Sequence, residues 1–229
     1  MREIVLDTET TGLDFRQGHR IIEIGCLELH DHVPTGETYH VYINPERDVP
    51  QGAVDIHGLT QERLSTEPIF SAVADAFLDF IGSDPLVIHN AGFDVPFLNS
   101  ELERINRAPI TFDRVVDTLL IARQRHPGGS NRLDDLCSRY RIDNSQRTLH
   151  GALLDSELLA EVYLELIGGR QTSLTLDSTQ QAGPAELVNE RAPRPSRVSR
   201  LSEDERARHS AFVESLGPDA LWRRYTSSN

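Results

Sequence analysis

The chain has 229 residues, of which 38% are hydrophobic and 26% are charged, and its formal net charge is −13. This composition is typical of a folded globular protein and excludes a chain that is disordered throughout. No apolar run approaches the roughly 18 residues that a membrane-spanning helix needs, and Asp7 follows the N-terminus too closely for a signal peptide. We therefore expect a cytoplasmic protein that binds no membrane, in which Cys26 and Cys137 are reduced thiols.

The net negative charge comes from the first 170 residues. Residues 1–170 hold 28 acidic and 15 basic side chains, whereas residues 171–229 hold eight of each. An acidic domain is poorly suited to bind nucleic acid by itself, because contacts to phosphate groups need cations. Either this part does not bind nucleic acid, or divalent metal ions supply the positive charge locally.

Strands and helices are predicted to alternate along this acidic part. Apolar runs predict three strands first, over residues 3–9, 20–29 and 38–44, and a loop at residues 45–52 follows them. Short apolar runs predict two more strands, at residues 86–90 and 115–116. Helical spacing of apolar residues predicts helices over residues 65–81, 93–107, 118–125, 133–140 and 152–167. This order indicates one α/β domain over residues 1–170.

The remaining residues differ in composition. Residues 171–200 are rich in Ser, Thr, Gln, Pro and Arg, which predicts a flexible linker. Ser202 is followed three residues later by Glu205, so we expect a capping box and a helix over residues 201–216. The apolar residues of segment 201–229 are too few to bury a core of their own.

Two carboxylates lie close together on the first predicted strand. Asp7 and Glu9 are two residues apart, so both side chains point to the same face of the sheet. Neighbouring carboxylates repel each other unless a cation lies between them, and no lysine is present in the chain to supply one. A divalent metal ion would, although a strand end that faces solvent explains this pair equally well.

Two further acids and a histidine begin or precede predicted helices. Asp94 follows the strand that ends at His89 and Asn90, and Asp155 comes five residues after His150. A helix dipole alone would account for Asp94. Taken together, however, these residues converge at one edge of an α/β sheet, and hard oxygen ligands there favour Mg²⁺ or Mn²⁺.

Three motifs resemble those of the DEDDh 3′–5′ exonucleases: DTETTG at residues 7–12, HNAGFD at residues 89–94, and His150 followed by Asp155. The longer runs at residues 134–140 and 147–155 are similar to the bacterial proofreading members of the family, and the similarity covers residues 3–176. The resemblance implies an RNase H-like fold with a mixed five-stranded sheet whose first three strands are antiparallel. It also implies that two divalent metal ions, Mg²⁺ or Mn²⁺, hydrolyse mispaired nucleotides from DNA 3′ ends and release nucleoside 5′-monophosphates.

The resemblance assigns roles to individual residues. The implied metal ligands are Asp7, Glu9, Asp94 and Asp155, and His150 matches the general base. The implied substrate contacts are Asp7, Glu9, Thr10, Leu13, His57, Phe93 and Asp155, with a contact near Gly52 left open because the family often has a Pro-Glu pair just upstream of the histidine. Leu13 and Phe93 would stack on unpaired bases or pack in the core. Asp117 is expected to cap a helix, and the histidines outside the motifs are expected to be solvated, namely His19, His30, His32, His40, His126 and His209.

The C-terminal segments are predicted to bind partners. Gln171, Leu174 and Leu176 resemble peptides of bacterial replication proteins that bind the sliding clamp, although chance spacing in a linker would look the same. Leu221 and Trp222 lie where no core of their own can bury them, and tryptophan is enriched in binding hot spots. We expect residues 201–229 to bind the polymerase (alpha) subunit, and whether a small theta-like subunit also binds is left open.

Two other functions remain open at this point. One is a free-standing exonuclease that acts on RNA or single-stranded DNA ends, and the linker-like extension argues against it. The other is a non-catalytic scaffold with the same fold. The complete set of acids with His150 argues against the scaffold, because a site that has lost its function has no reason to keep a cluster of mutually repelling carboxylates.

Overall fold

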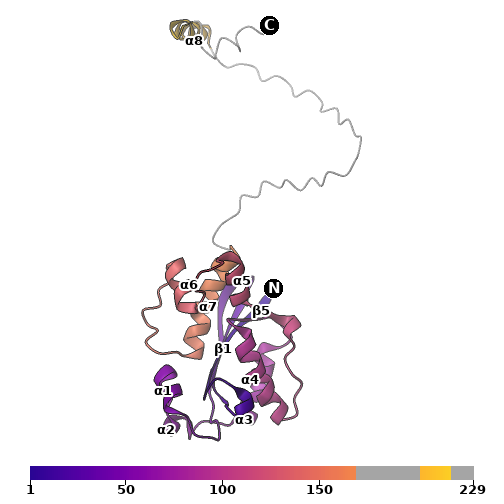
Figure 1. Cartoon of the computed structure of the whole chain (residues 1–229). Coiled ribbons are helices and arrows are strands. Elements are labelled where there is room, and N and C mark those ends of the chain that lie inside the picture. Colours follow the sequence, from indigo (N-terminus) through magenta and orange to yellow (C-terminus); the bar gives the residue numbers. More distant parts are fainter. Residues whose placement is uncertain (169–201, 218–229) are drawn as a thin grey trace. The chain divides into compact units, whose positions relative to one another are not determined.

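The computed structural model describes residues 1–168 and 202–217. Residues 1–168 belong to one compact unit, and helix α8 (Glu203–Ser215) belongs to a second. The two units are described separately (Figure 1). The predicted clamp-binding residues Gln171, Leu174 and Leu176 and the predicted polymerase-binding residues Leu221 and Trp222 lie outside the described residues.

A five-stranded sheet forms the centre of the first unit, in the order β3-β2-β1-β4-β5. Strands β1 (Arg2–Thr10), β2 (Ile21–His30) and β3 (Val33–Tyr42) are antiparallel, whereas β4 (Leu86–Ile88) pairs in parallel with β1 and with β5 (Val115–Asp117). The prediction of a mixed five-stranded sheet whose first three strands are antiparallel is confirmed.

Helices cover both faces of this sheet. The larger ones are α3 (Phe70–Ile81), α4 (Ala91–Arg104), α5 (Thr118–Arg125), α6 (Leu133–Tyr140) and α7 (Ala152–Leu166). Side chains alternate along β1, so that Ile4 and Leu6 pack against α3 and α4, while Val5 packs in a second core with α6 and α7. In Figure 1, α6 and α7 lie on one side of β1 and α4 lies on the other. Strand β1, which carries Asp7 and Glu9, is therefore packed on both faces by a hydrophobic core.

The loop predicted at residues 45–52 is confirmed as far as residue 50, but the chain becomes helical at Gln51, and the two short helices that follow were not predicted. Helix α1 (Gln51–His57) begins directly after Pro50 and ends at Gly58, whose φ of 74° is the left-handed conformation that glycine favours. The side chain of Thr60 accepts a hydrogen bond from the backbone N–H of Arg63 and caps α2 (Gln61–Leu64). Both helices are shorter than two full turns. Helices this short carry too few apolar residues to give a periodic signal in the sequence.

Two predicted boundaries were also wrong. Helix α3 begins at Phe70 and not at residue 65, because the chain containing Pro68 runs extended, and Ile69 forms a bridge with Asn44. Strand β3 begins at Val33, five residues before the predicted start. It follows a tight turn in which Asp31 and His32 both have positive φ, at 51° and 66°. Most of its side chains are exposed, so its first half lacks the apolar alternation that marks a buried strand.

Helix α8 confirms the prediction for the second unit. The Ser202 side chain accepts a hydrogen bond from the backbone N–H of Glu205, and the Glu205 carboxylate accepts one from the backbone N–H of Ser202. This is the reciprocal pair of a capping box. No helix within residues 1–168 or 202–217 is long and apolar enough to cross a membrane.

Candidate active site

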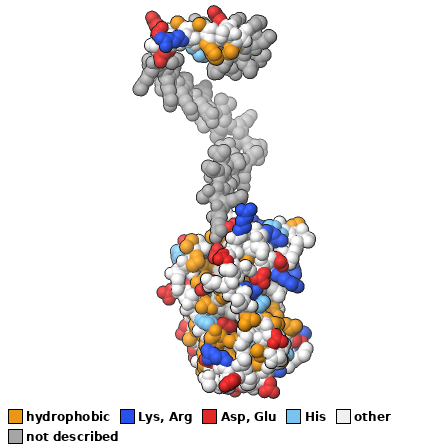
Figure 2. All heavy atoms as spheres, turned by 90° about the vertical axis from the view of Figure 1, so that its left-hand side faces the viewer, with side chains coloured by type: hydrophobic (Ala, Val, Ile, Leu, Met, Phe, Trp, Pro, Cys, Tyr) orange, Lys and Arg blue, Asp and Glu red, His pale blue; other side chains and the backbone are white. Residues whose placement is uncertain are grey.

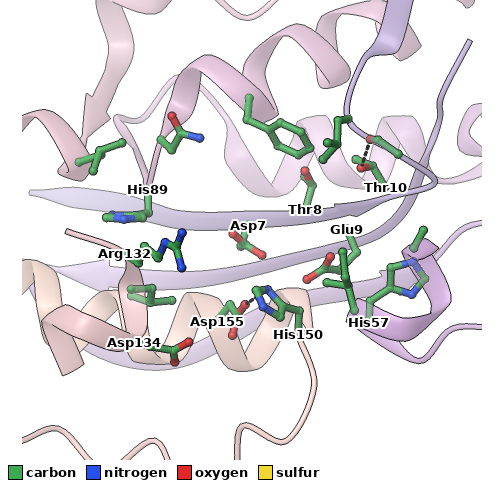
Figure 3. Close-up of a pocket in the computed structure, with 18 of the residues that line it drawn as sticks. Asp7, Thr8, Glu9, Thr10, His57, His89, Arg132, Asp134, His150 and Asp155 are labelled. Atoms are coloured by element: carbon green, nitrogen blue, oxygen red, sulfur yellow. Dashed lines mark hydrogen bonds and ion pairs between the residues drawn. The ribbon is translucent and has the colours of Figure 1, made fainter. Parts of the chain in front are cut away.

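A cavity of about 1380 Å³ lies across the C-terminal half of β1. Asp7 and Glu9 both line it, as their spacing of two residues along the strand predicts. His150 and Asp155 line it as well. Figure 2 shows acidic and histidine side chains close together on the middle of one face of this unit. In Figure 3 the labelled residues run along the cavity, from His89 and Arg132 at one end to Glu9 and His57 at the other.

A glycine on the neighbouring strand brings Asp155 to the cluster. Gly25 on β2 pairs with Asp7, and the first turn of α7 packs directly on it. A Cβ atom at position 25 would lie 2.2 Å from the backbone nitrogen of Leu153, so any other residue would push α7 away. The Ser156 hydroxyl donates a 2.9 Å hydrogen bond to the Gly25 carbonyl and fixes this contact. The start of α7 therefore lies against β1, and Asp155 lies beside Asp7.

Asp94 reaches the cluster from the opposite side of β1. Asn90 adopts a left-handed conformation, with φ of 66°, and turns the chain from β4 into α4. Asp94 in the first turn of α4 then accepts hydrogen bonds at Oδ1 from the Thr8 backbone N–H (3.1 Å) and the Thr8 hydroxyl (2.6 Å). Asp94 is only 3% exposed and does not line the cavity, whereas the other three acids do.

Mutual repulsion and burial raise the pKa values of the carboxyl groups. The pKa of Asp7 is raised well above its usual range, that of Glu9 to about 8 and that of Asp94 to about 7. Burial is the main cause of all three shifts. The charges of Asp94, Glu9 and Asp155 add to the effect at Asp7. The cluster therefore holds protons at neutral pH unless a cation replaces them.

The donor atoms fit a divalent metal ion. Glu9, His150 and Asp155 each offer one ligand atom, and these three atoms lie within 4.8 Å of one another. Carboxylate oxygens are the ligands that Mg²⁺ and Mn²⁺ prefer. The charge that the sequence left unbalanced is therefore concentrated where a metal ion would neutralise it.

Arg147 is a cation in this cluster that the sequence analysis missed. Its Nε and Nη2 atoms donate hydrogen bonds of 2.5 and 2.7 Å to the two carboxylate oxygens of Asp155, and its Nη1 donates one of 2.6 Å to Asp134. The side chain is only 7% exposed. Arg147 precedes Asp155 by eight residues in an irregular segment, and no periodic pattern relates the two positions. Only its place in the motif run at residues 147–155 could have drawn attention to it.

His150 lies beside Arg147, and both side chains line the cavity. Its Nδ1 accepts a 3.0 Å hydrogen bond from Arg147 Nη2, and it lies 3.6 Å from an oxygen of Asp155. Burial and the Arg147 charge lower the pKa of His150. The imidazole is thus neutral near pH 7, with its proton on Nε2, because an arginine can only donate. Its side chain is 49% exposed, which leaves it room to turn.

Helix α1 places His57 at the other end of the cavity. His57 Nδ1 accepts a 3.0 Å hydrogen bond from the Leu59 backbone N–H, so the proton of the neutral ring is on Nε2. That Nε2 is buried and has no hydrogen-bond partner among the described residues. Burial lowers the pKa of His57. Gly52, in the first turn of the same helix, also lines the cavity. Nothing lies within 4 Å of the position that a Cβ atom would take there.

The remaining predicted substrate contacts also line the cavity. The Thr10 hydroxyl donates a 2.7 Å hydrogen bond to the Gly12 carbonyl. Leu13 is 82% exposed at the rim, so core packing does not explain it. Phe93 lines the cavity and packs its ring on Phe97, at 5.0 Å between centroids. Of the predicted site residues within the described chain, all except Asp94 thus face one cavity.

The prediction for the other histidines was wrong at three positions, His19, His32 and His126, which are partly buried. His19 and His126 line the cavity, where they are half-buried and bonded to Thr11 Oγ1 (3.0 Å) and the Tyr140 hydroxyl (2.6 Å). His32 and His40 lie 2.6 and 2.7 Å from the buried carboxylates of Glu3 and Glu23. His30, His40 and His209 are exposed as predicted, and His40 remains exposed beside Glu23. Single histidines give no sequence signal for such partners, because the partners lie on other elements. Asp117 is confirmed as a helix cap, since its Oδ1 accepts a 2.9 Å hydrogen bond from the Leu119 N–H.

Comparison with known proteins agrees with this geometry. The family model described as Exonuclease matches residues 4–163. DNA polymerase III subunit epsilon of Rickettsia felis is 47% identical over 222 residues, which cover 94% of this chain and 97% of that protein. DNA polymerase III subunit epsilon of Escherichia coli (strain K12) is 45% identical over 237 residues and covers 97% of both chains.

Solved structures share the fold at lower sequence identity. Exonuclease X in complex with 5′ overhanging duplex DNA has a TM-score of 0.58 at 23% identity, and the nuclease domain of 3′hExo, a DEDDh family member, bound to rAMP, has a TM-score of 0.61 at 18% identity. Each covers 73% of this chain and 92% of the other. Both likenesses concern the fold alone.

The chain therefore belongs to the exonuclease family, whose members of this type use divalent metal ions. Within that family it belongs with the epsilon subunits of DNA polymerase III. The prediction of a 3′–5′ proofreading exonuclease that works on DNA within a DNA polymerase III complex is confirmed at the level of the family.

Proposed function

We propose that the chain removes mispaired nucleotides from frayed DNA 3′ ends as the proofreading subunit of DNA polymerase III, and that it releases nucleoside 5′-monophosphates. The observation that carries this proposal is the convergence of Asp7, Glu9, His150 and Asp155 on one cavity. The residues come from β1, from the irregular segment before α7 and from α7 itself, and a shared cavity is what a joint catalytic function needs.

Asp7, Glu9, Asp94 and Asp155 would hold two divalent metal ions, Mg²⁺ or Mn²⁺. When bound, such ions lower the pKa of an attacking water and stabilise the negative charge of the transition state. Both Thr8 bonds to Asp94 end on Oδ1, so Asp94 would bind through Oδ2. Asp155 would exchange its bidentate contact with Arg147 for a metal ion, since one carboxylate cannot serve both cations in full.

His150 would accept the proton of the attacking water as general base. Its lowered pKa keeps the ring neutral and therefore able to accept a proton at pH 7. In the described geometry the lone pair is on Nδ1, which Arg147 occupies. Release of Asp155 from Arg147 would also free Nδ1, and the half-exposed ring could then turn toward the water.

The other cavity residues would hold the 3′-terminal nucleotide. The buried Nε2–H of His57 needs an acceptor, and a phosphate or sugar oxygen of the nucleotide would provide one. Leu13 and Phe93 would contact the face of an unpaired base, a contact that tolerates any base. Thr10, beside the turn at Gly12, would contact the terminal sugar.

The parts of the chain would divide the work. Residues 1–170 would form the exonuclease domain. Residues 171–200 would form a linker that begins with the clamp-binding residues Gln171, Leu174 and Leu176. Residues 201–229 would bind the polymerase alpha subunit through Leu221 and Trp222. A small theta-like subunit would be a further partner, and the complex would act in the bacterial cytoplasm, where DNA is replicated.

One assay tests this proposal against its rivals. The full chain is incubated with matched and mismatched 3′ ends, on DNA and on RNA, with and without Mg²⁺ or Mn²⁺. The proposal predicts metal-dependent release of nucleoside 5′-monophosphates that is faster from mismatched DNA ends. Faster hydrolysis of RNA would favour a free-standing RNA exonuclease, and no hydrolysis of any substrate would favour a binding scaffold.

A further inference from the structure

The cavity continues beyond the carboxylates to a second end. This end is lined by α5 and by the segment that joins α5 to α6, with the residues Leu119, Arg123, His126, Asn131 and Arg132. In Figure 3, Arg132 lies beside His89, on the side of Asp7 that is opposite to Glu9 and His57. The role of this end is not explained by the carboxylate cluster.

Two arginines present positive charge at this second end. Leu119, Arg123 and His126 follow each other at spacings of four and three, so they share one face of α5 that lines the cavity. Within residues 1–168 and 202–217, Arg123 and Arg132 make no hydrogen bond and no ion pair. Neighbouring arginines do: Arg125 donates to the Glu165 carbonyl at 3.5 Å, and Arg139 donates to the Ser130 carbonyl at 3.0 Å.

Hydrogen bonds fix the backbone that carries these arginines. His89 lies 2.9 Å from the Thr118 hydroxyl and 2.9 Å from the Asn131 carbonyl, so it ties the end of β4 to α5 and to the segment before Arg132. Asn131 Nδ2 in turn donates to the Gly129 carbonyl at 3.0 Å. A ligand that binds here does not have to order the backbone first, which lowers the entropy cost of binding.

We propose that Arg123 and Arg132 form a phosphate-binding subsite for the DNA strand on the 5′ side of the bond that is cut. The inference rests on the proposed function and adds the path of the strand to it. With the 3′-terminal nucleotide near Thr10 and His57, and the cut at the carboxylates, the next phosphates run toward Arg132. A guanidinium donates paired hydrogen bonds to phosphate oxygens. The two arginines thus attract the strand at a place where the net charge of the domain repels it.

Substrate length separates this subsite from the catalytic centre. A thymidine dinucleotide has a single phosphodiester, which is the one that is cut, whereas a thymidine hexanucleotide has four more on its 5′ side. We would measure kcat and KM of the full chain with Mn²⁺ on both substrates over a range of salt concentrations. The variants are R123Q, R132Q, the double variant, and Arg125→Gln as the control, since Arg125 lies on the same helix but does not line the cavity.

The double variant should bind the longer substrate less well. We expect its KM on the hexanucleotide to rise about tenfold at low salt, with kcat changed less than twofold. The slope of log KM against log salt should fall by about 0.7 per arginine, as for the loss of one contact to a single strand. KM on the dinucleotide should stay within about twofold, the Arg125 control should match the wild type, and the double lysine variant should restore the salt slope because it keeps the charges.

Three results would overturn the subsite. The first is a double variant that behaves like the wild type on the hexanucleotide, and the second is an equal loss on both substrates, which would place the arginines in the catalytic centre or in folding. The third is a lysine variant that does not restore the salt slope. If the wild-type chain hydrolyses neither substrate, the proposed function itself fails, and that outcome is distinct from these three.

Discussion

The carboxylates and the histidine of the active site are held in very different ways. Asp7 and Glu9 lie on the central strand between two cores, and Asp94 is fixed by two hydrogen bonds from Thr8. His150 lies in an irregular segment before α7, with half of its side chain exposed. Metal ligands need a fixed geometry, whereas a group that moves a proton must approach and leave its partner. The proposed metal ligands thus lie on firmly packed elements, and the proposed general base lies in an exposed segment, as their proposed roles require.

Removing one of the two carboxylates on β1 should have the largest effect on activity. Asp7→Asn or Glu9→Gln should lower kcat by at least about a thousandfold, roughly 4 kcal/mol of barrier, because a metal ligand is lost. The melting temperature without metal should stay the same or rise, since a repelling charge has been removed. Steady-state kinetics and thermal unfolding of the same samples measure both effects. Activity within about tenfold of the wild type would exclude these residues as metal ligands.

Removing the half-exposed His150 should cost less and leave DNA binding intact. His150→Ala should lower kcat by about 10²–10⁴, the usual contribution of a general base. The wild-type rate should fall at acid pH, where a protonated His150 can no longer accept a proton, and this acidic limb should disappear in the variant. A pH–rate profile that keeps its acidic limb in His150→Ala would assign the proton transfer to another group.

Arg147 contacts both Asp155 and His150, and its loss should destabilise the metal-free protein. Arg147→Gln leaves the buried Asp155 carboxylate without its bidentate partner, which should cost about 1–3 kcal/mol of unfolding free energy. Saturating Mg²⁺ or Mn²⁺ should recover most of this loss, because a bound ion neutralises Asp155 instead. Chemical denaturation with and without metal measures the difference, and Arg107→Gln at an exposed ion pair serves as the control. A loss of stability that metal does not reduce would mean that Arg147 supports the fold and not the charge of the site.

The buried carboxylates should also make the stability of the metal-free protein depend on pH between about pH 4 and pH 8. Their folded-state pKa values are raised, so the folded protein binds more protons than the unfolded chain between about pH 4 and pH 8. Its unfolding free energy should therefore fall as the pH rises through this window, and added metal should flatten the slope. Melting temperatures across the window with and without EDTA test this. The same slope in Glu9→Gln would show that other groups are responsible.

The smallest expected effect concerns Gly52. Gly52→Ala should raise the unfolding free energy by about 0.4–1 kcal/mol, because alanine favours a helix and nothing lies within 4 Å of the new Cβ atom. We expect kcat and KM to stay within about twofold of the wild type. A marked rise in KM would show that the substrate passes close to this position of α1.

The sequence predicted the positions of the carboxylates on β1 better than the contacts around Arg147 and α1. Period-two alternation placed Asp7 and Glu9 on one face, and the acids at the starts of α4 and α7 followed from element order. It did not predict that Asp94 lies behind the strand, because the Thr8 hydrogen bonds depend on the approach of α4. It also missed α1 and the ion pair between Arg147 and Asp155. Both depend on contacts between segments that have no periodic pattern of their own.

The contact between Gly25 and α7 limits which changes the active site can tolerate. Gly25 has no side chain and therefore no chemical role, but the spacing between Asp7 and Asp155 depends on its small size. A methyl group at position 25 would push the start of α7 away and so separate Asp155 from Asp7, without altering either carboxylate. A strain that carries such a change should therefore accumulate more replication errors. A genetic screen for elevated mutation rates would therefore find this glycine as readily as the acids themselves.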